Sequence, residues 1–236
     1  MPPQAEFTGF TPQTVKFFED LVFNNDKEWF EEHRKVYEEH VLAPSRALVV
    51  ALGRRLEPLA PGIIADPRLN KSLFRLFRDV RFSKDKSPYK THLGLWLWEG
   101  DHQPRMERPG FYFHFQPSQL LLGAGMYQFP RHLLDPFRQA VVDPKLGPAL
   151  TQAVAAVEKA GLEMAGRHYK RVPRGFDPGH PRAELLKYHG LTALRWEPIP
   201  PEFYTPELVE YAVRAFEKML PLHHWLMRFT AWADQL

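Results

Sequence analysis

Residues 110–126 read GFYFHFQPSQLLLGAGM, and this stretch decides the fold. Its first half alternates phenylalanine with tyrosine, histidine and glutamine. Because successive side chains of a β-strand point to opposite faces, the alternation predicts a strand near 110–116 with one apolar face. Pro117-Ser118 makes a tight return into a second strand near 119–126, so the pair is predicted to be an antiparallel hairpin.

The residues before this hairpin continue the same pattern. Bulky apolar residues alternate with polar ones and turn residues separate the runs, which predicts further strands near 73–78 and 92–99. Together these segments predict an antiparallel meander of about four or more strands over residues 69–127.

Helical periodicity dominates both ends of the chain. Thr11-Pro12 provides an N-cap and a first-turn proline, Asn24-Asn25 favours a left-handed helix ending, and Asp26 can cap the next helix. The N-terminal helices occupy about 11–57 and the C-terminal helical region about 131–236, with an irregular stretch at 166–181 that is rich in Pro and Gly. The predicted helices span about 11–24, 26–41, 44–56, 131–142, 145–160, 205–219 and 221–232. The expected fold class is α+β, in a single domain over residues 1–236.

Composition limits the classes of protein that fit. The chain has 236 residues, 44% hydrophobic and 25% charged, which is enough to build a sizeable core. It has no cysteine, which excludes disulfides, thiolate nucleophiles and sulfur-ligated zinc. The start Met1-Pro-Pro-Gln-Ala-Glu is not a basic and apolar leader, and no apolar run has spanning length, so a cytoplasmic protein without a membrane partner is expected.

Residues 75–92 form the most chemically dense segment, RLFRDVRFSKDKSPYKTH. Clustered guanidinium and ammonium groups beside hydroxyls suit a phosphate or carboxylate, so we expect an anion site here. Pro88 restrains the backbone, and Phe77 and Phe82 argue against a wholly solvated charge run. The alternative is a set of solvated surface ion pairs. The candidate ligand-binding residues are Arg75, Arg78, Asp79, Arg81, Lys84, Lys86, Tyr89, Lys90 and His92.

A second basic cluster lies in and beyond the irregular stretch, between Arg167 and Lys187. Its candidate ligand-binding residues are Lys170, Arg174 and His180, and Gly175 and Gly179 allow a turn that presents backbone amides. The alternative is a solubilising surface loop. The sequence leaves open whether the two clusters meet.

No catalytic motif identifies a reaction. The spacings of the 11 histidines give weak support to a metal site, and none is expected. No nucleotide-binding glycine motif or nucleophile elbow is present, and the cofactor is left open. Whether the protein is an enzyme stays open. If it is one, phosphoryl or phosphodiester chemistry with His92 or His180 moving a proton is the simplest hypothesis.

Three motifs resemble a family of conserved hypothetical proteins, domain of unknown function 2461. They are Phe17-Phe-Glu-Asp-Leu-x-x-Asn-Asn-x-x-x-Trp-Phe30, the segment from Phe77 to His92, and Lys170-Arg-x-Pro-x-Gly-Phe-x-x-x-His-Pro181. The resemblance covers most of the chain and implies that these segments belong to one recurring design. It implies no substrate, cofactor or catalytic residue.

Three functional hypotheses follow. The first is binding of a phosphate-bearing or other anionic ligand by the basic segment. The second is binding of single-stranded nucleic acid, with Phe82, Tyr89 or Trp96 stacking on bases while the cations follow the backbone. The third is a structural or protein-interaction role, in which the Arg and Asp residues form internal pairs and the acidic N-terminal helices meet the basic region. The oligomeric state is left open.

Overall fold

A computed structural model describes residues 6–100 and 104–236. The sequence prediction about the very start of the chain falls on residues 1–5, outside this range. The chain forms two compact units. Unit 1 comprises Met1–Leu97, Tyr112–Leu122 and Trp196–Arg214, and unit 2 comprises Trp98–Phe111, Gly123–Arg195 and Ala215–Leu236. The expectation of a single domain stays a prediction.

The predicted α+β class is confirmed. The described residues contain a six-stranded sheet in the order β1-β2-β3-β4-β6-β5, in which β5 and β6 pair antiparallel. The predicted strands near 92–99, 110–116 and 119–126 are confirmed. The strands are β1 Ile63–Ile64, β2 Leu93–Glu99, β3 Gly110–Gln116, β4 Gln119–Met126, β5 Glu163–Arg167 and β6 Tyr188–Pro198.

The strand predicted near 73–78 is wrong. This segment makes only isolated bridges, Leu73 to Leu95 and Phe77 to Tyr89. Its backbone turns from one partner to the other, because Phe74 N–H donates to Gly94 O whereas Arg78 N–H donates to Pro88 O. Pro88 has no N–H with which to extend the ladder. The result is a short two-stranded projection, not a sheet strand.

The strands β5 and β6 were not predicted. In β5 the register shifts between Ala165 and Arg167, and Gly166 has φ of 109°. A Cβ at Gly166 would lie 2.1 Å from the carbonyl oxygen of Gly190, so only glycine allows the two backbones to approach this closely. The glycines and the bulge interrupt the alternation that a sequence pattern needs.

Unit 1 begins with helices that the sequence mostly predicted. The helix α1 spans Pro12–Phe23, and Thr11 N–H donates to Thr14 Oγ1 at its start (3.1 Å). Asn24 has φ of −124°, so the predicted left-handed ending is wrong. Asp26 caps α2 as predicted, accepting a hydrogen bond from Trp29 N–H.

The second predicted helix is broken into three pieces. They are α2 Lys27–Glu32, α3 Arg34–Tyr37 and a π-helical turn Glu38–Leu42, which leads directly into α4 Ala43–Leu56. A π turn disturbs the regular pairing of helical carbonyls. Here Thr14 Oγ1 donates to the His40 carbonyl oxygen at 2.6 Å, so α1 satisfies the irregular turn.

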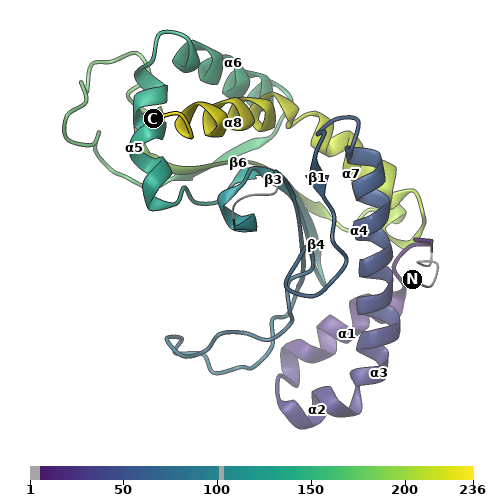
Figure 1. Cartoon of the computed structure of the whole chain (residues 1–236). Helices are drawn as coiled ribbons and strands as arrows, with labels where there is room; N and C mark the ends of the chain where they lie inside the picture. The colour runs from purple at the N-terminus through teal and green to yellow at the C-terminus, as the bar shows by residue number, and fades with distance from the viewer. Residues whose placement is uncertain (1–5, 101–103) are drawn as a thin grey trace. The chain divides into compact units, whose positions relative to one another are not determined.

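The core of unit 1 lies on one face of the sheet. Phe113 and Phe115 have no exposed surface, and Phe115 packs against Phe18 and Phe203 with ring centroids 5.6 and 4.6 Å apart. Figure 1 shows α1, α3 and α4 along one side of these strands, whereas the segment between residues 77 and 88 extends away on the other. The opposite sheet face in unit 1 is therefore the one without these helices.

Unit 2 has its own helical core. The helices α5 Arg131–Val142, α6 Leu146–Lys159 and α8 Leu220–Ala233 pack together, and α7 Leu208–Glu217 is divided between the units. Phe137, Trp225 and Phe229 have no exposed surface. His223 is also buried, with its Nε2 2.7 Å from a carboxylate oxygen of Glu99. Among the described helices, none has the length and apolarity to span a membrane.

Candidate functional site

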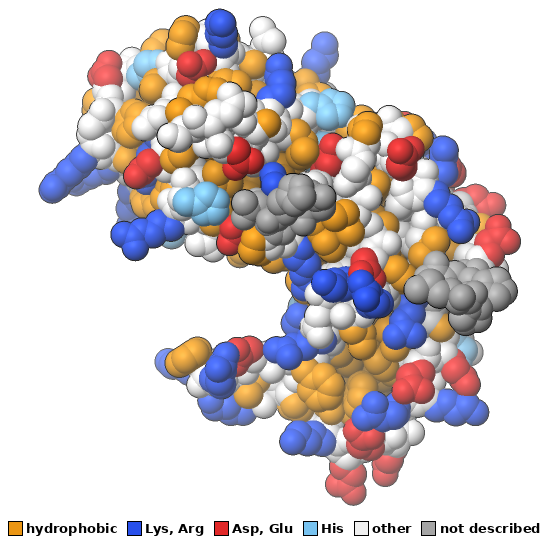
Figure 2. All heavy atoms as spheres, in the orientation of Figure 1, with side chains coloured by type: hydrophobic (Ala, Val, Ile, Leu, Met, Phe, Trp, Pro, Cys, Tyr) orange, Lys and Arg blue, Asp and Glu red, His pale blue; other side chains and the backbone are white. Residues whose placement is uncertain are grey.

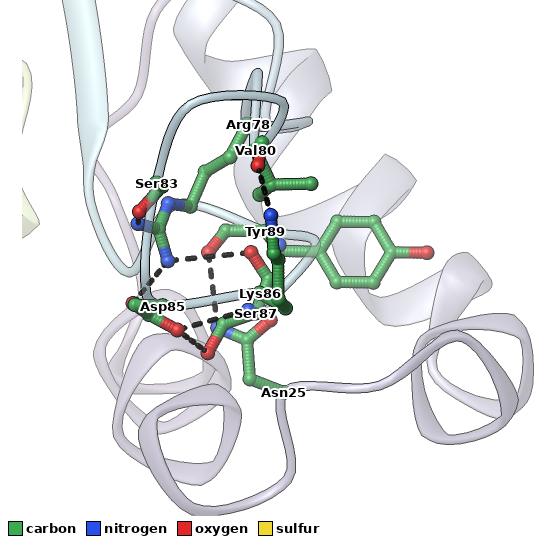
Figure 3. A network of polar contacts seen from close by, with 8 residues as sticks. All are labelled: Asn25, Arg78, Val80, Ser83, Asp85, Lys86, Ser87 and Tyr89. Carbon is green, nitrogen blue, oxygen red and sulfur yellow. Dashed lines mark hydrogen bonds and ion pairs between the residues drawn. The ribbon is translucent and has the colours of Figure 1, made fainter.

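The basic segment is a projecting hairpin whose base is fixed by Asn25 (Figure 3). Asn25 Nδ2 donates to the Tyr89 carbonyl oxygen and Tyr89 N–H donates to Asn25 Oδ1, both at 3.0 Å. The bridge between Phe77 and Tyr89 uses other backbone groups, so Asn25 occupies the open edge of this hairpin as a third strand would. The helix junction and the basic segment, two motifs of the family resemblance, are thus in direct contact.

Ion pairs inside the segment shape the tip of the hairpin. Asp79 accepts from Arg81 Nε (2.9 Å) and Nη2 (2.7 Å), and Arg78 pairs with Asp85. The Arg81 side-chain hydrogen bonds lower the pKa of Asp79 to about 2, and hydrogen bonds from Ser87 and Arg78 lower the pKa of Asp85. Lys86 Nζ donates to the Val80 carbonyl oxygen at 2.9 Å. Both acids of the segment are therefore engaged within it.

The remaining cations give the hairpin its positive charge. Six cationic and two acidic side chains lie between residues 75 and 92, an excess of four positive charges. Arg75 and Lys84 are exposed, and neither makes an ion pair with any residue in the described ranges. In Figure 2 blue side chains gather on the projecting segment.

Two aromatic residues of the hairpin differ sharply in exposure. Phe82 is 96% exposed at the tip, and the Arg81 guanidinium lies 5.8 Å from its ring centroid. Tyr89 is 1% exposed, and its ring stacks on Phe30 at 4.4 Å, pointing away from the tip (Figure 3). Burial raises the pKa of the Tyr89 hydroxyl. Tyr89 thus anchors the hairpin, and neither it nor Trp96, 4% exposed, offers a ring to solvent.

His92 leads from the hairpin into a group of polar rings on the open sheet face. His92 stacks on His114 with centroids 4.4 Å apart, and the Tyr112 hydroxyl lies 3.0 Å from His114 Nδ1. Trp196, on β6, meets His114 edge-on at 5.7 Å and is 44% exposed. We call His92, Tyr112, His114 and Trp196 the ring cluster.

Burial sets the protonation of the ring cluster. It lowers the pKa of His92 to about 4, with smaller contributions from His114 and Lys90. It also lowers the pKa of His114, an effect that the nearby Gln116 side chain partly offsets, and raises the pKa of Tyr112 to about 12. Both imidazoles are neutral near pH 7, so each carries one donor and one acceptor nitrogen.

One atom of the cluster is unsatisfied. His114 is 8% exposed, and its Nε2 is buried without a hydrogen-bond partner among the described residues. A buried polar group in this state costs about 1–3 kcal/mol, so its presence calls for an explanation.

The ring cluster and the hairpin are linked through Phe74. The Lys90 ammonium lies 5.2 Å from the Phe74 ring centroid, and Phe74 meets Tyr112 edge-on at 6.3 Å. A Cβ at Gly94 would lie 3.1 Å from Phe74 and 3.2 Å from the Tyr112 hydroxyl, so this glycine gives both rings their room. Lys90 at the base of the hairpin is therefore linked to Tyr112 of the ring cluster through Phe74.

The second basic cluster, in unit 2, has six cationic and two acidic side chains between residues 167 and 187, and it is only partly paired. Glu184 pairs with Arg167 at 2.7 Å and with Lys187, and Arg182 Nε donates to the Val141 carbonyl oxygen. His180 Nδ1 accepts from Arg182 N–H, which is a turn contact. Lys170 and Arg174 are exposed at the surface of this loop.

Sequence reasoning identified the hairpin but missed most of the ring cluster. His92 was selected, whereas Tyr112, His114 and Trp196 were not. The available signal was the polar half of the alternation at 110–116, which placed Tyr112 and His114 on one face without showing what covers it. No group of three or more His, Asp or Glu that could hold a metal occurs in residues 6–100 and 104–236.

Comparison with known proteins gives a family and no activity. No curated protein matches the chain. The family model described as a conserved hypothetical protein, DUF2461, matches residues 13–225, which include the helix junction, the hairpin and the ring cluster. The chain therefore belongs to the DUF2461 family of conserved hypothetical proteins.

Proposed function

We propose that unit 1 binds a phosphate-bearing ligand along the hairpin of residues 75–92. One observation carries the proposal: both carboxylates of the segment are already bound to arginines within it, while exposed Arg75 and Lys84 have no ion-pair partner in the described chain. The excess charge of the hairpin is thus available to an external anion.

The contacts assign different roles to the arginines. Arg78 uses both terminal nitrogens inside the hairpin, on Asp85, Ser87 and Ser83, and therefore supports the loop. Arg81 gives Asp79 only its Nε and Nη2, so its Nη1 side is directed elsewhere. An arginine oriented in this way by a carboxylate loses less side-chain entropy when it binds a phosphate. Arg75, Arg81, Lys84 and Lys90 would contact the ligand.

Titration of the purified chain with pyrophosphate, followed by calorimetry, tests this function. We expect Lys84→Ala and Arg75→Ala each to weaken binding several-fold, because each removes a charge-assisted contact worth about 1 kcal/mol or more. Arg54→Ala is the matched control, since Arg54 is an exposed cation on α4 of the same unit. Equal weakening by all three variants would mean a general charge effect without a site. Absence of pyrophosphate binding at low salt would contradict the proposal.

A second candidate, single-stranded nucleic acid, is favoured by Phe82. An almost fully exposed phenylalanine beside Arg81 and Lys84 suits base stacking next to a backbone phosphate. Binding of an oligothymidylate with a steep salt dependence, weakened by Phe82→Ala, would support this candidate. A shallow salt dependence and an inert Phe82→Ala would favour a compact ligand. Failure of both probes would favour the structural or protein-interaction hypothesis.

A further inference from the structure

Unit 1 exposes two phenylalanines, one on the hairpin and one at the end of its first helix. Phe82 is 96% exposed at the tip of the hairpin, and Phe23 is 85% exposed at the end of α1, beside Val22 at 51%. Neither phenylalanine packs against another ring within residues 6–100 and 104–236. A ring this exposed contributes little to the core, whereas its burial against a partner is favourable. Both rings are therefore available for an interface.

The hairpin is firmly held at its base and reaches away from it. Two hydrogen bonds join Asn25 to the Tyr89 backbone, and both acids of the hairpin are bound to its own arginines. Five residues separate Phe77 at the base from Phe82, so the tip lies up to about 16 Å from the base. Figure 1 shows this segment extending away from α1, α3 and α4. The tip can therefore reach a second molecule while the base stays attached to the helices.

The surface around Phe23 has the opposite charge to the hairpin. Residues 19–32, which we call the acidic junction, contain six acidic and one cationic side chain, an excess of five negative charges against an excess of four positive charges in the hairpin. Glu19, Glu28 and Glu32 are exposed and form no ion pair with any residue that the structure describes. In Figure 2 red side chains gather near the position of α2, and blue ones gather on the hairpin. The two surfaces are thus complementary in charge, and each has an exposed ring.

We propose that the hairpin of one copy of the chain docks on the acidic junction of a second copy, with Phe82 against Val22 and Phe23. Both surfaces belong to unit 1 and adjoin at the contact between Asn25 and Tyr89, so a single two-fold rotation makes both contacts at once. An unrelated acidic protein would cover only the hairpin and leave Phe23 exposed. The inference goes beyond the proposed phosphate-binding function and does not rest on it.

Sedimentation of the full chain over a range of concentrations tests the pairing. We expect a reversible dimer with twice the chain mass of 27.6 kDa. Its dissociation constant should rise about tenfold between about 0.05 M and about 0.5 M salt, because salt screens charges at an exposed interface. A chain that stays monomeric up to about 1 mM would overturn the inference. A dimer whose affinity does not depend on salt would also overturn it.

Three variants connect dimerisation to the exposed rings. Phe82→Ser and Phe23→Ser should each raise the dissociation constant about tenfold or more, because each removes a ring that occurs twice in the interface. Tyr127→Ser is the matched control, since Tyr127 is a 74% exposed aromatic residue of unit 2. It should leave the dissociation constant unchanged. Equal weakening by all three variants would mean general association through exposed rings and would contradict the proposal.

The absence of cysteine allows the contact to be mapped by cross-linking. Ser83→Cys places a thiol next to Phe82, and Asn24→Cys places one next to Phe23. A short bismaleimide should join the two variants when they are mixed. Either variant alone should give little cross-linked dimer, because the two-fold pairing brings a hairpin to an acidic junction and not to another hairpin. Cross-linking of either variant alone as efficient as that of the mixture would overturn this arrangement.

Pyrophosphate separates the pairing from the proposed ligand site. A bound pyrophosphate and the acidic junction of a second copy would use the same exposed cations, Arg75 and Lys84, so pyrophosphate should weaken the dimer. A dimer in a chain that binds no pyrophosphate would support the pairing and contradict the proposed function. Pyrophosphate binding by a chain that is always monomeric would do the reverse. An unchanged dimer affinity with pyrophosphate bound would show that the hairpin cations do not hold the second copy, and would overturn the inference.

Discussion

The two faces of β3 carry buried side chains of opposite chemical character. Phe113 and Phe115, on one face, have no exposed surface, and their rings contact other buried phenylalanines such as Phe10 and Phe203. His114, between them on the other face, is nearly as buried but carries a ring nitrogen without a hydrogen-bond partner in the described chain. The difference shows that burial alone does not make a residue part of an apolar core, since the chemistry of the buried atoms differs between the two faces.

The largest expected effect concerns the face of β3 that carries Phe113 and Phe115, which we call the sealed face because it is completely buried. Phe115→Ala removes a ring packed against Phe18 and Phe203, and we expect it to lower the free energy of unfolding by about 3–5 kcal/mol. Gln116→Ala, the next residue on the open face, should change it by no more than about 0.5 kcal/mol. Urea denaturation of the three proteins measures both values. Similar losses in the two variants would contradict the division into a sealed and an open face.

Acid should lower the free energy of unfolding through the histidines of the open face, whereas Phe113 and Phe115 on the sealed face have no group that titrates. The pKa of His92 is lowered from 6.5 to about 4 in the folded state, so the unfolded state binds more protons between these values. Stability should therefore fall as the pH drops from about 6.5 to 4, by up to about 3 kcal/mol from His92, with His114 acting in the same direction.

The variant His92→Gln separates this effect from the carboxylates. The pKa of Asp79 is about 2, so loss of its stabilising charge belongs to lower pH than the histidine window. Stability of the wild type and of His92→Gln, measured by denaturation at several pH values, should differ in slope between pH 6.5 and 4. Parallel slopes would show that His92 is protonated equally in both states.

A smaller effect tests how the hairpin is held beside the open face. Asn25→Ala removes both hydrogen bonds to the Tyr89 backbone and should cost about 1–3 kcal/mol. Amide exchange of residues 77–90 should speed up in this variant, because the edge that Asn25 covers becomes open to water. Asn24→Ala is the control, since Asn24 Nδ2 bonds only the neighbouring Asp20 carbonyl oxygen. Unchanged exchange in Asn25→Ala would mean that ring packing alone fixes the hairpin.

The sequence predicted what depends on local periodicity. Alternation identified β3, and the turn at Pro117-Ser118 identified β4 as its partner. The cap at Asp26 was correct because capping is decided by neighbouring residues. It failed where a distant residue decides the outcome. The segment near Phe77 reads as a strand, yet its backbone partners change from Gly94 to Pro88 and Lys90, which no local pattern shows.

The candidate site divides in the same way. The charges of the hairpin are visible as a cluster in the sequence, but their pairing is not. In the structure Arg78 and Asp85 form an ion pair within the hairpin. The ring cluster joins residues 92, 112, 114 and 196, which only the sheet topology brings together. Long-range contacts therefore decide the parts of the fold and of the candidate site that the sequence did not predict.

The smallest expected change in stability concerns the hairpin, where one phenylalanine is exposed and another packs against Tyr89. Phe82→Ser replaces a ring that is 96% exposed and should alter the free energy of unfolding by no more than about 0.5 kcal/mol. Phe77→Ser is the matched comparison, because Phe77 packs against Tyr89 with centroids 5.0 Å apart and is 46% exposed, so it should be clearly more destabilising. Thermal denaturation of both variants measures this difference. If Phe82→Ser leaves stability unchanged and weakens oligothymidylate binding, the exposed ring serves a partner. If it destabilises the protein as much as Phe77→Ser does, Phe82 packs against the chain in solution, and the tip offers no ring for stacking.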